Sequence, residues 1–302
     1  MNIAYLISAH TDAPQLKRLI EALHPDAEFF VHIDRKTDIT PFTSLISTPR
    51  VHFIQQRVDV VWGTMTEVEY QMNLIREAVL HPLHFHRIFF LSGMDYPLWS
   101  TERITAWLEQ QQGRELLQGI CMDTPQLNTH QRTLYTTRRP FSRCRRGAIL
   151  TRKMLSLLRF RKKLSFRAGT DTWHLYKGSA WWCISQELAT FLLKEYEGNK
   201  PLRKYFRDSF CPAETLIQTI AFNSPRWAQR CILTQGQYPG LDALTPLHFI
   251  DYHPVIRVLD ETDFPRLMES GKMFCRKVVS GKSDRLVKQI ETDRQTNKQT
   301  NK

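Results

Sequence analysis

The first third of the chain alternates short apolar runs with longer amphipathic runs, and this rhythm restricts the fold more than any other sequence feature. Apolar runs typical of buried strands cover residues 3–8, 29–33, 51–54 and 87–92. Amphipathic runs typical of helices cover residues 14–23, 65–80 and 101–111. Strands that alternate with helices build βαβ units, in which helices cover both faces of a parallel sheet. The sequence therefore predicts an α/β fold with a Rossmann-like half.

Ligands of such sheets bind beyond the carboxyl ends of the strands. The polar or charged residues at these predicted ends are Ser8 and His10, His32 and Asp34, and Ser92 with Asp95. Because the carboxyl ends of parallel strands share one edge of a sheet, we expect these side chains to lie along one rim.

The net charge of +12 comes from one segment of the chain. Residues 124–170 contain no Asp or Glu and hold thirteen Lys and Arg, which leaves 29 basic and 30 acidic residues elsewhere. Within this segment, residues 148–164 can be drawn as a helix with an apolar and a cationic face, either a surface helix or a mobile flap. Such a local charge suits a phosphate group, an anionic membrane face or an acidic acceptor.

The sequence offers no evident metal site. Nucleotide-sugar sites commonly pair two aspartates as Asp-x-Asp around a divalent ion, but Asp34 has no such neighbour and this pair occurs nowhere in the chain. One carboxylate alone holds a divalent ion poorly. The histidines of residues 81–87 lack metal-ligand spacing with a supporting carboxylate and favour a helix-to-strand connection. We expect no metal and no other cofactor.

The six cysteines form no Cys-x-x-Cys pair and most lie in apolar runs, which favours buried free thiols. The chain starts almost directly with a strand-like run, and no segment approaches the ~20 apolar residues that span a bilayer. These features predict a cytoplasmic protein.

Three stretches join a Gly to a Trp or Tyr and a polar residue, namely residues 58–69, 89–100 and 174–185. Aromatic faces pack on the C–H faces of sugar rings, while interleaved polar groups bind the hydroxyls. Each stretch alone is equally well explained by core packing at a tight turn. Their recurrence near predicted strand ends favours a sugar site.

Two further places carry charge in unusual settings. Glu214 follows Pro212 and Ala213 at the start of an apolar-periodic helix, where an acid is either catalytic or simply favourable to the helix dipole. Arg276 and Lys277 stand between apolar residues, a setting that predicts an anionic partner for at least one of them.

Seven of these stretches, in this order, resemble glycosyltransferase family 14, the core-2/I-branching N-acetylglucosaminyltransferases and peptide xylosyltransferases. They are "AYLISAH", "FFVHIDRK", "VVWGTMTEVE", "FFLSGMDYPLWS", "GSAWWCIS", "CPAETLIQT" and "MFCRKV", and they span residues 1 to about 280. The resemblance implies a GT-A type fold, in which a nucleotide-binding half and an acceptor-binding half flank one cleft. It also implies sugar transfer from a UDP-sugar with inversion, a glutamate base and no metal.

The resemblance also assigns residues. Glu214 matches the family's base, although Ala213 stands where the family usually has an acid. Arg276 and Lys277 match the family's diphosphate-binding pair, with Cys275 in place of an Ala. Donor-side segments contribute Ser8, His10, Asp34, Asp59, Trp62 and Gly63, and Arg257 is the candidate second phosphate-binding cation. Acceptor or sugar-lining candidates are Asp95, Tyr96, Ser179, Trp181, Trp182 and Tyr252.

We therefore expect one GT-A catalytic domain over residues 1–286. Residues 1–122 form mainly the nucleotide-sugar half, 123–170 a basic insertion or flap, and 171–286 the acceptor and catalytic half. The polar tail 287–302 is predicted to be disordered.

The expected function is transfer of N-acetylglucosamine or xylose from a UDP-sugar to a hydroxyl of a glycan or lipid-linked acceptor. Animal members of the family carry a membrane anchor and secretory disulfides. This sequence predicts neither feature, so we expect a bacterial-type cytoplasmic enzyme. Contact with the anionic inner face of a membrane fits the basic segment, and no nucleic-acid partner is expected. The rival hypothesis is a non-catalytic basic module that binds nucleic acid or anionic membrane through residues 132–167.

Overall fold

The structure of the chain is a computed structural model that describes residues 1–139, 145–158, 160–252 and 255–300. Its centre is a five-stranded sheet in the order β10-β4-β1-β2-β3. The strands are β1 (Ile3–Ala9), β2 (Glu28–Ile33), β3 (Val51–Phe53), β4 (Arg87–Ser92) and β10 (Trp182–Ile184). The first four are parallel, and β10 pairs antiparallel with β4. The predicted parallel α/β sheet is confirmed.

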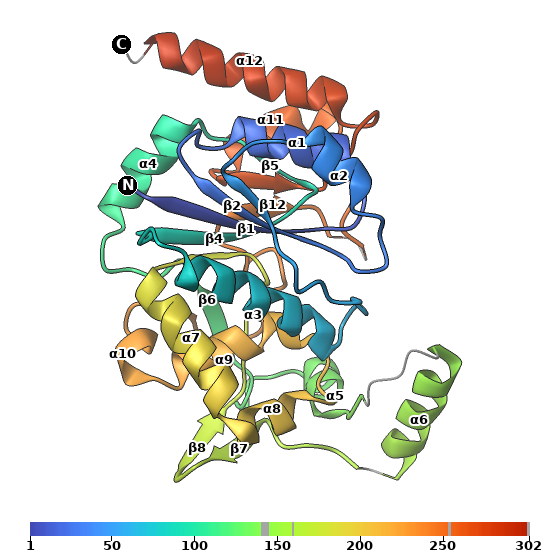
Figure 1. The fold of residues 1–302 in the computed structure, drawn as a ribbon. Coiled ribbons are helices and arrows are strands. Elements are labelled where there is room, and N and C mark those ends of the chain that lie inside the picture. Colours follow the sequence, from blue (N-terminus) through green and yellow to red (C-terminus); the bar gives the residue numbers. More distant parts are fainter. Residues whose placement is uncertain (140–144, 159, 253–254, 301–302) are drawn as a thin grey trace.

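Helices cover both faces of this sheet (Figure 1). One face packs on α1 (Ala13–Ala22), α2 (Thr40–Leu45) and α4 (Thr101–Gln110), and the other on α3 (Met65–Leu80), α7 (Gln186–Gly198) and α9 (Leu216–Phe222). Side chains of β1 alternate between the two sides, because Tyr5 belongs to the same core cluster as Leu16 of α1, whereas Leu6 belongs to the cluster of Leu74 of α3. Burial on both faces explains the continuous apolar runs in the sequence.

Smaller sheets extend this centre. They have the orders β11-β6-β9, β12-β13-β5 and β7-β8. Their strands are β5 (Asp95–Pro97), β6 (Gln118–Cys121), β7 (Ser165–Ala168), β8 (Asp171–His174), β9 (Tyr176–Lys177), β11 (Ile232–Thr234), β12 (His248–Ile250) and β13 (Phe274–Arg276). The remaining helices are α5 (Thr129–Thr136), α6 (Arg145–Leu157), α8 (Lys200–Phe206), α10 (Pro225–Ala228), α11 (Phe264–Glu269), α12 (Asp284–Thr300) and the 3-10 turns η1 (Pro212–Glu214) and η2 (Glu261–Asp263).

The prediction of a disordered tail is wrong for those tail residues that the structure describes. Residues 284–300 form α12, which lies over α11 and the end of α1 (Figure 1). Leu286, Val287 and Ile290 are buried in a third core cluster with Tyr96. Tyr96 donates a hydrogen bond to Glu291 (2.8 Å), and Arg294 donates one to the Ala22 carbonyl (2.8 Å). Three apolar residues on one helical face anchor an otherwise polar segment.

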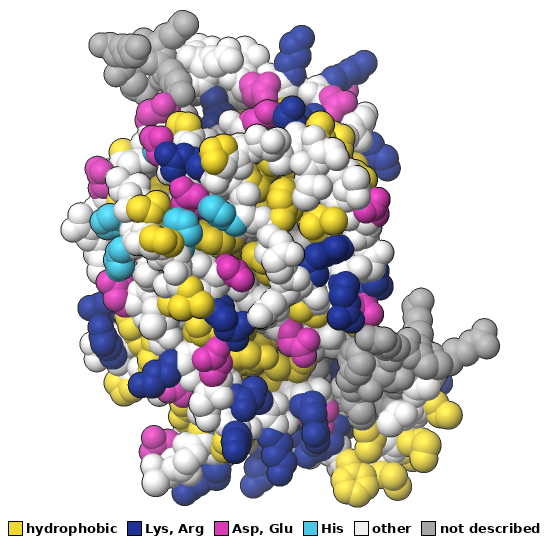
Figure 2. All heavy atoms as spheres, in the orientation of Figure 1, with side chains coloured by type: hydrophobic (Ala, Val, Ile, Leu, Met, Phe, Trp, Pro, Cys, Tyr) yellow, Lys and Arg dark blue, Asp and Glu magenta, His cyan; other side chains and the backbone are white. Residues whose placement is uncertain are grey.

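The basic segment contains helix α6, which stands apart from the body of the molecule (Figure 1). Figure 2 shows apolar side chains exposed there and Lys and Arg side chains gathered on the adjoining lower part of the same face. The five cysteines that the structure describes are free thiols, as predicted, and Cys144 lies outside the described residues. Among the helices that the structure describes, none combines the length and the apolar character needed to cross a membrane.

Candidate active site at the carboxyl ends of the strands

The carboxyl ends of β1, β2 and β4 form one rim. Ser8 at the end of β1 is in register with His32 of β2 and with Ser92 of β4. Asp34 follows β2, and its amide donates to the Ala9 carbonyl (3.0 Å). His10 lies just beyond β1 with an exposed side chain. These polar residues share one edge, as the rhythm of the sequence predicts.

Asp34 and Asp59 come close together at this rim, although 24 residues lie between them in the sequence. The Lys36 ammonium lies between them, 3.1 Å from Asp34 Oδ2 and 2.9 Å from Asp59 Oδ1. His32 helps to hold the loop that carries Asp59, because its Nε2 accepts a hydrogen bond from the Val58 amide (2.9 Å). Burial lowers the pKa of His32 to about 4, so the ring is neutral at pH 7. A lysine thus balances the two carboxylates.

The loop at Trp62 and Gly63 is joined to the turn that carries Glu214. Gly63 has φ +74°, a conformation that favours glycine, and its carbonyl accepts a hydrogen bond from the Cys211 amide (3.2 Å). The Trp62 ring, 75% exposed, meets the Phe210 ring edge-on at 6.1 Å. Cys211 itself has φ +42°, which is uncommon for a residue with a side chain and is compatible with local strain. This contact brings a donor-side segment next to the candidate base.

Glu214 ends the 3-10 turn η1, and its carboxylate accepts a hydrogen bond from the Lys177 ammonium through Oε2. Lys177 is buried at the end of β9, with its Nζ 5.5 Å from the Tyr135 ring centre and 5.7 Å from that of Tyr238. Burial alone would lower the pKa of Lys177, but the Glu214 carboxylate raises it well above the usual lysine range. Lys177 is therefore a fixed positive charge against one oxygen of Glu214.

Gly178, next to Lys177, allows strands β6 and β9 to approach closely. A Cβ at this position would lie 2.1 Å from the Gln118 carbonyl oxygen, and the Gly178 amide donates to the Glu214 carbonyl (2.9 Å). The sequence analysis missed Lys177. A lysine in the apolar run before Trp181 was the available signal, because buried lysines require a charged partner.

Glu67, in the first turn of α3, is a second carboxylate of this region and was also missed. Its Oε2 accepts a hydrogen bond from the Gly63 amide (2.7 Å). Burial raises its pKa to about 7, and the negative charge of Glu214 adds to the rise. Two carboxylates therefore face the same loop, but only Glu214 has Lys177 as a partner.

Arg276 is held by Asp95. Arg276 Nη1 lies 2.8 Å from Asp95 Oδ1, while Oδ2 accepts hydrogen bonds from the Ser92 amide (2.7 Å) and meets His248 Nε2 (3.1 Å). The guanidinium also lies 4.9 Å from the centre of the Trp181 ring. Burial by itself would raise the pKa of Asp95, but Arg276 and His248 hold it below its usual range. Asp95 is thus a completely buried anchor for Arg276.

Lys277 follows Arg276 and is half-buried. Burial and the charge of Arg276 both lower its pKa. Within the described ranges, no acceptor or acid pairs with its ammonium. Its backbone amide donates to the Arg257 carbonyl (3.2 Å), so the two candidate phosphate-binding residues are neighbours. The Arg257 guanidinium, however, already contacts Asp263 and lies 3.1 Å from Asp251.

Two aromatic candidates lie in the core and not on the cleft, so their assignment as lining residues is wrong. Trp182 has no exposed surface and stacks on Phe90 at 5.4 Å, and Tyr96 is equally inaccessible beneath α12. Ser179 is buried as well, with its hydroxyl on the Trp181 carbonyl (3.0 Å). Tyr252 is 47% exposed and accessible to a ligand.

In the part of the chain that the structure describes, one group has three possible metal ligands close together: Glu28, His52 and His81, with ligand atoms within 4.8 Å of one another. Glu28 begins β2, so this group lies at the amino end of the strand, opposite the rim of Asp34. It also carries an ion pair to Arg50 (2.8 Å). The sequence analysis missed this group because its members come from three elements.

Comparison with known proteins places this chain in a family. The signature described as "Core-2/I-Branching enzyme" matches residues 3–242. The chain belongs to the core-2/I-branching enzyme family. The predicted resemblance is therefore confirmed, and with it the GT-A type fold. The match includes Glu67, Lys177 and Glu214 but ends before Arg257, Arg276 and Lys277.

Relatives with curated names are distant in sequence. The human beta-1,3-galactosyl-O-glycosyl-glycoprotein beta-1,6-N-acetylglucosaminyltransferase is 23% identical over 223 residues, which cover 72% of this chain and 48% of the relative. Xylosyltransferase oxt of Drosophila pseudoobscura is 22% identical over 235 residues, which cover 74% of this chain and 24% of the relative. The aligned segment thus spans about half of the first relative and a quarter of the second.

Proposed function

We propose that this family member is a glycosyltransferase that moves N-acetylglucosamine or xylose from a UDP-sugar to a hydroxyl of a glycan or lipid-linked acceptor. The names of the relatives support the reaction and these two sugars. The observation that carries the proposal is Glu214, a carboxylate 23% exposed beside the donor-side loop, with one oxygen fixed by Lys177. The other oxygen, Oε1, has no hydrogen-bond donor among the described residues.

In the proposed reaction, Glu214 Oε1 accepts the proton of the acceptor hydroxyl while the hydroxyl oxygen attacks the anomeric carbon of the donor sugar. A bond forms between this carbon and the acceptor oxygen, and the bond to the β-phosphate breaks on the opposite face. The configuration at the anomeric carbon is therefore inverted. Lys177 keeps the carboxylate in one orientation, which such a proton transfer requires.

The departing UDP gains negative charge on its β-phosphate, and fixed positive charge assists its departure. Lys277 is suited to this task because it has no acidic partner among the residues described, whereas Arg276 is held by Asp95. We propose that these cations replace a metal ion. Asp34 and Asp59 would then contact the nucleoside, with Lys36 balancing their charge.

Helix α6 fits a peripheral contact with an anionic membrane. Ile149, Leu150, Met154 and Leu157 are 39–84% exposed, and Lys153 on the same helix is exposed too. Exposed apolar side chains beside cations suit the headgroup region of an anionic bilayer. Sedimentation with anionic but not with neutral vesicles tests this contact.

The Glu214→Gln variant tests the base. A neutral amide of the same shape cannot take the proton, so turnover should fall by ~100- to 10,000-fold while UDP binding stays unchanged. Glu187→Gln is the matched control, since Glu187 is an exposed acid in the first turn of α7. Turnover of Glu214→Gln within a few-fold of the wild type would place the base elsewhere. A chain that binds no UDP at all would contradict the enzymatic proposal and favour a basic binding module.

A panel of UDP-sugars identifies the donor. Many transferases hydrolyse their own donor slowly when the acceptor is missing, so release of UDP ranks the candidate sugars without knowledge of the acceptor. We expect UDP-N-acetylglucosamine or UDP-xylose to give the highest rate. A preference for UDP-glucose or UDP-galactose would reject both named donors and keep the base assignment.

A further inference from the structure

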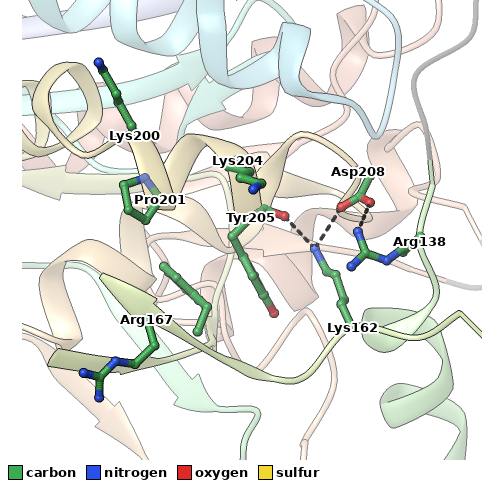
Figure 3. Close-up of a pocket in the computed structure, with 9 residues that line it drawn as sticks. Arg138, Lys162, Arg167, Lys200, Pro201, Lys204, Tyr205 and Asp208 are labelled. Atoms are coloured by element: carbon green, nitrogen blue, oxygen red, sulfur yellow. Dashed lines mark hydrogen bonds and ion pairs between the residues drawn. The ribbon is translucent and has the colours of Figure 1, made fainter. Parts of the chain in front are cut away.

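A pocket of about 490 Å³ lies beside α8 (Figure 3), a helix in the lower part of the molecule as drawn in Figure 1. It is built by the segment after α5, the segment between α6 and β7, strand β7 and helix α8. Five of its nine lining residues are cationic and one is acidic: Arg138, Lys162, Phe166, Arg167, Lys200, Pro201, Lys204, Tyr205 and Asp208. Its lining therefore carries a formal charge of +4 when Lys162 is protonated.

The floor of this pocket is a fixed cation, Lys162. Its side chain is only 5% exposed, and its ammonium donates hydrogen bonds to the Tyr205 carbonyl (2.9 Å) and to the Ser209 hydroxyl. Asp208 lies 3.7 Å from this ammonium and 2.6 Å from Arg138 Nη1. One carboxylate thus holds two cations in place and leaves a net positive charge (Figure 3).

The rim of the pocket adds charge that no acid balances. Arg167 on β7 and Lys200 and Lys204 on α8 are exposed, and within residues 1–139, 145–158, 160–252 and 255–300 none of them has an acidic partner. Cations gathered around one concave surface repel one another and attract anions. Burial lowers the pKa of Lys162 to about 8, and a bound anion would raise this pKa again.

One wall of the pocket is aromatic. The Tyr205 ring stacks on Phe166 at 4.2 Å, and the Lys162 ammonium lies 4.0 Å from the centre of the Tyr205 ring. Phe166 and Lys162 therefore cover the Tyr205 ring, and this wall fixes the shape of the pocket.

The pocket adjoins the turn that carries Glu214. Asp208 and Ser209, which hold Lys162, lie directly before Phe210 and Cys211. The Phe210 ring contacts Trp62 on one side and Tyr135 on the other, and Tyr135 faces Lys177. Five of the lining residues belong to residues 171–286, the half expected to hold the acceptor, and four to the basic segment 123–170. The pocket shares no element with Lys277, the cation proposed for the donor diphosphate.

The geometry points to a phosphate-binding site in this pocket, separate from the donor site, that takes a phosphate group attached to the acceptor. The site itself is independent of the proposed function, and only its assignment to the acceptor rests on it. The contacting groups would be Arg167, Lys200 and Lys204 at the rim, while the paired cations Lys162 and Arg138 at the floor add to the positive field of the pocket.

Inorganic pyrophosphate is the probe for this site. Calorimetric titration of the whole chain at low salt, with the donor site saturated by UDP, excludes the donor site from the measured binding, and the comparison of variants isolates the pocket. The pocket variant carries Lys200→Gln and Lys204→Gln, at the first residue and in the last turn of α8, so the two losses of positive charge have opposite effects on the helix dipole. The matched control carries Lys282→Gln and Lys288→Gln, which remove the same charge from two exposed lysines elsewhere.

We expect the pocket variant to bind pyrophosphate at least tenfold more weakly than the wild type, with an unchanged melting temperature, and the control to stay within twofold. Equal binding by all three proteins would overturn the site. A third outcome is that the wild-type protein binds phosphatidylglycerol vesicles but not pyrophosphate, and that the pocket variant loses the vesicle binding. This outcome would overturn the assignment to an acceptor and identify a lipid headgroup as the ligand. UDP binding is measured first, so its absence contradicts the proposed function without affecting the pyrophosphate result.

Discussion

Asp95 and Glu214 are both carboxylates that hold a cation. The pair of Asp95 and Arg276 is called closed here because both carboxylate oxygens are occupied, and the pair of Glu214 and Lys177 is called open because one oxygen is free of donors among the described residues. Asp95 has no exposed surface, and both of its oxygens are occupied by Arg276, His248 and the Ser92 amide. Glu214 is 23% exposed and gives only Oε2 to Lys177. The difference separates a carboxylate that stabilises the fold from one that can take a proton.

The same contrast holds for the cations beside the proposed donor site. Arg276 belongs to the closed pair, and Arg257 is tied to Asp251 and Asp263. Lys277 has no such partner among the described residues. A count of basic residues therefore does not measure the charge available to a ligand, because paired cations are already neutralised.

Asp95→Asn tests the closed pair. It leaves the charge of Arg276 in a site that is only 14% exposed, and loss of one partner of a buried pair costs about 3–5 kcal/mol. We expect the free energy of unfolding, measured with urea, to fall by this amount. Asp251→Asn is the control and should cost less than about 1 kcal/mol, because its partners Arg257 and Arg266 are 43% and 58% exposed. Equal losses in both variants would remove the distinction drawn for Asp95.

Lys177→Met tests the open pair. This change leaves Glu214 without its cation, but Glu214 is 23% exposed and can be solvated, so the loss of stability should be smaller than for Asp95→Asn. Turnover should fall by ~100-fold because the carboxylate is no longer oriented. Lys272→Met, at a half-buried lysine that donates to the Thr245 carbonyl (2.9 Å), is the control and should keep full turnover. Undiminished turnover of Lys177→Met would show that Glu214 needs no fixed partner.

Lys277→Ala tests the unpaired cation. Loss of a charge-assisted hydrogen bond should weaken UDP binding by ~10-fold or more and lower turnover together with it. Lys282→Ala, an exposed lysine five positions later, should change neither. Activity should also survive excess EDTA. Strict dependence on added manganese, with normal activity of Lys277→Ala, would show that an ion neutralises the phosphates.

Glu67→Gln gives the smallest effect and concerns pH. The folded pKa of Glu67, about 7, lies above the ordinary glutamate value of 4.5, so the folded state binds more protons than the unfolded state between these values. The contribution of this residue to the free energy of unfolding is therefore full below about pH 4.5 and is lost as the pH rises to about 7. Urea unfolding at pH 5 and 7.5 should show a smaller pH dependence in the variant. An identical difference in both proteins would assign the titration to another group.

Much of the central sheet and its helices follows from local sequence. The strands 3–9, 28–33 and 87–92 and the helices 13–22 and 65–80 match the apolar and amphipathic runs because burial imposes their periods directly. Their order also predicts the rim of Ser8, Asp34 and Ser92. The position of α12 was missed because its polar composition hides three apolar residues on one face.

The partners within the site could not be predicted in the same way. Lys177 meets Glu214 across 37 positions of sequence, and Lys36 joins Asp34 to Asp59 only after two loops have packed. An aromatic residue in a strand-end segment gives no sign of whether it faces the cleft or the core. Trp181 lies against Arg276, whereas its neighbour Trp182 points into the core, since successive side chains of a strand alternate.

Helix α12 affects the order in which the molecule can assemble. During synthesis, β1 and α1 leave the ribosome before α12, and domains generally fold from the amino-terminal side as they emerge. Arg294 contacts the carbonyl of Ala22 at the end of α1, and Glu291 contacts Tyr96. This layer can close only after residue 294 has been made. Until then a nascent chain exposes the apolar surface that Val287 and Ile290 later cover, which makes it a natural substrate for chaperones.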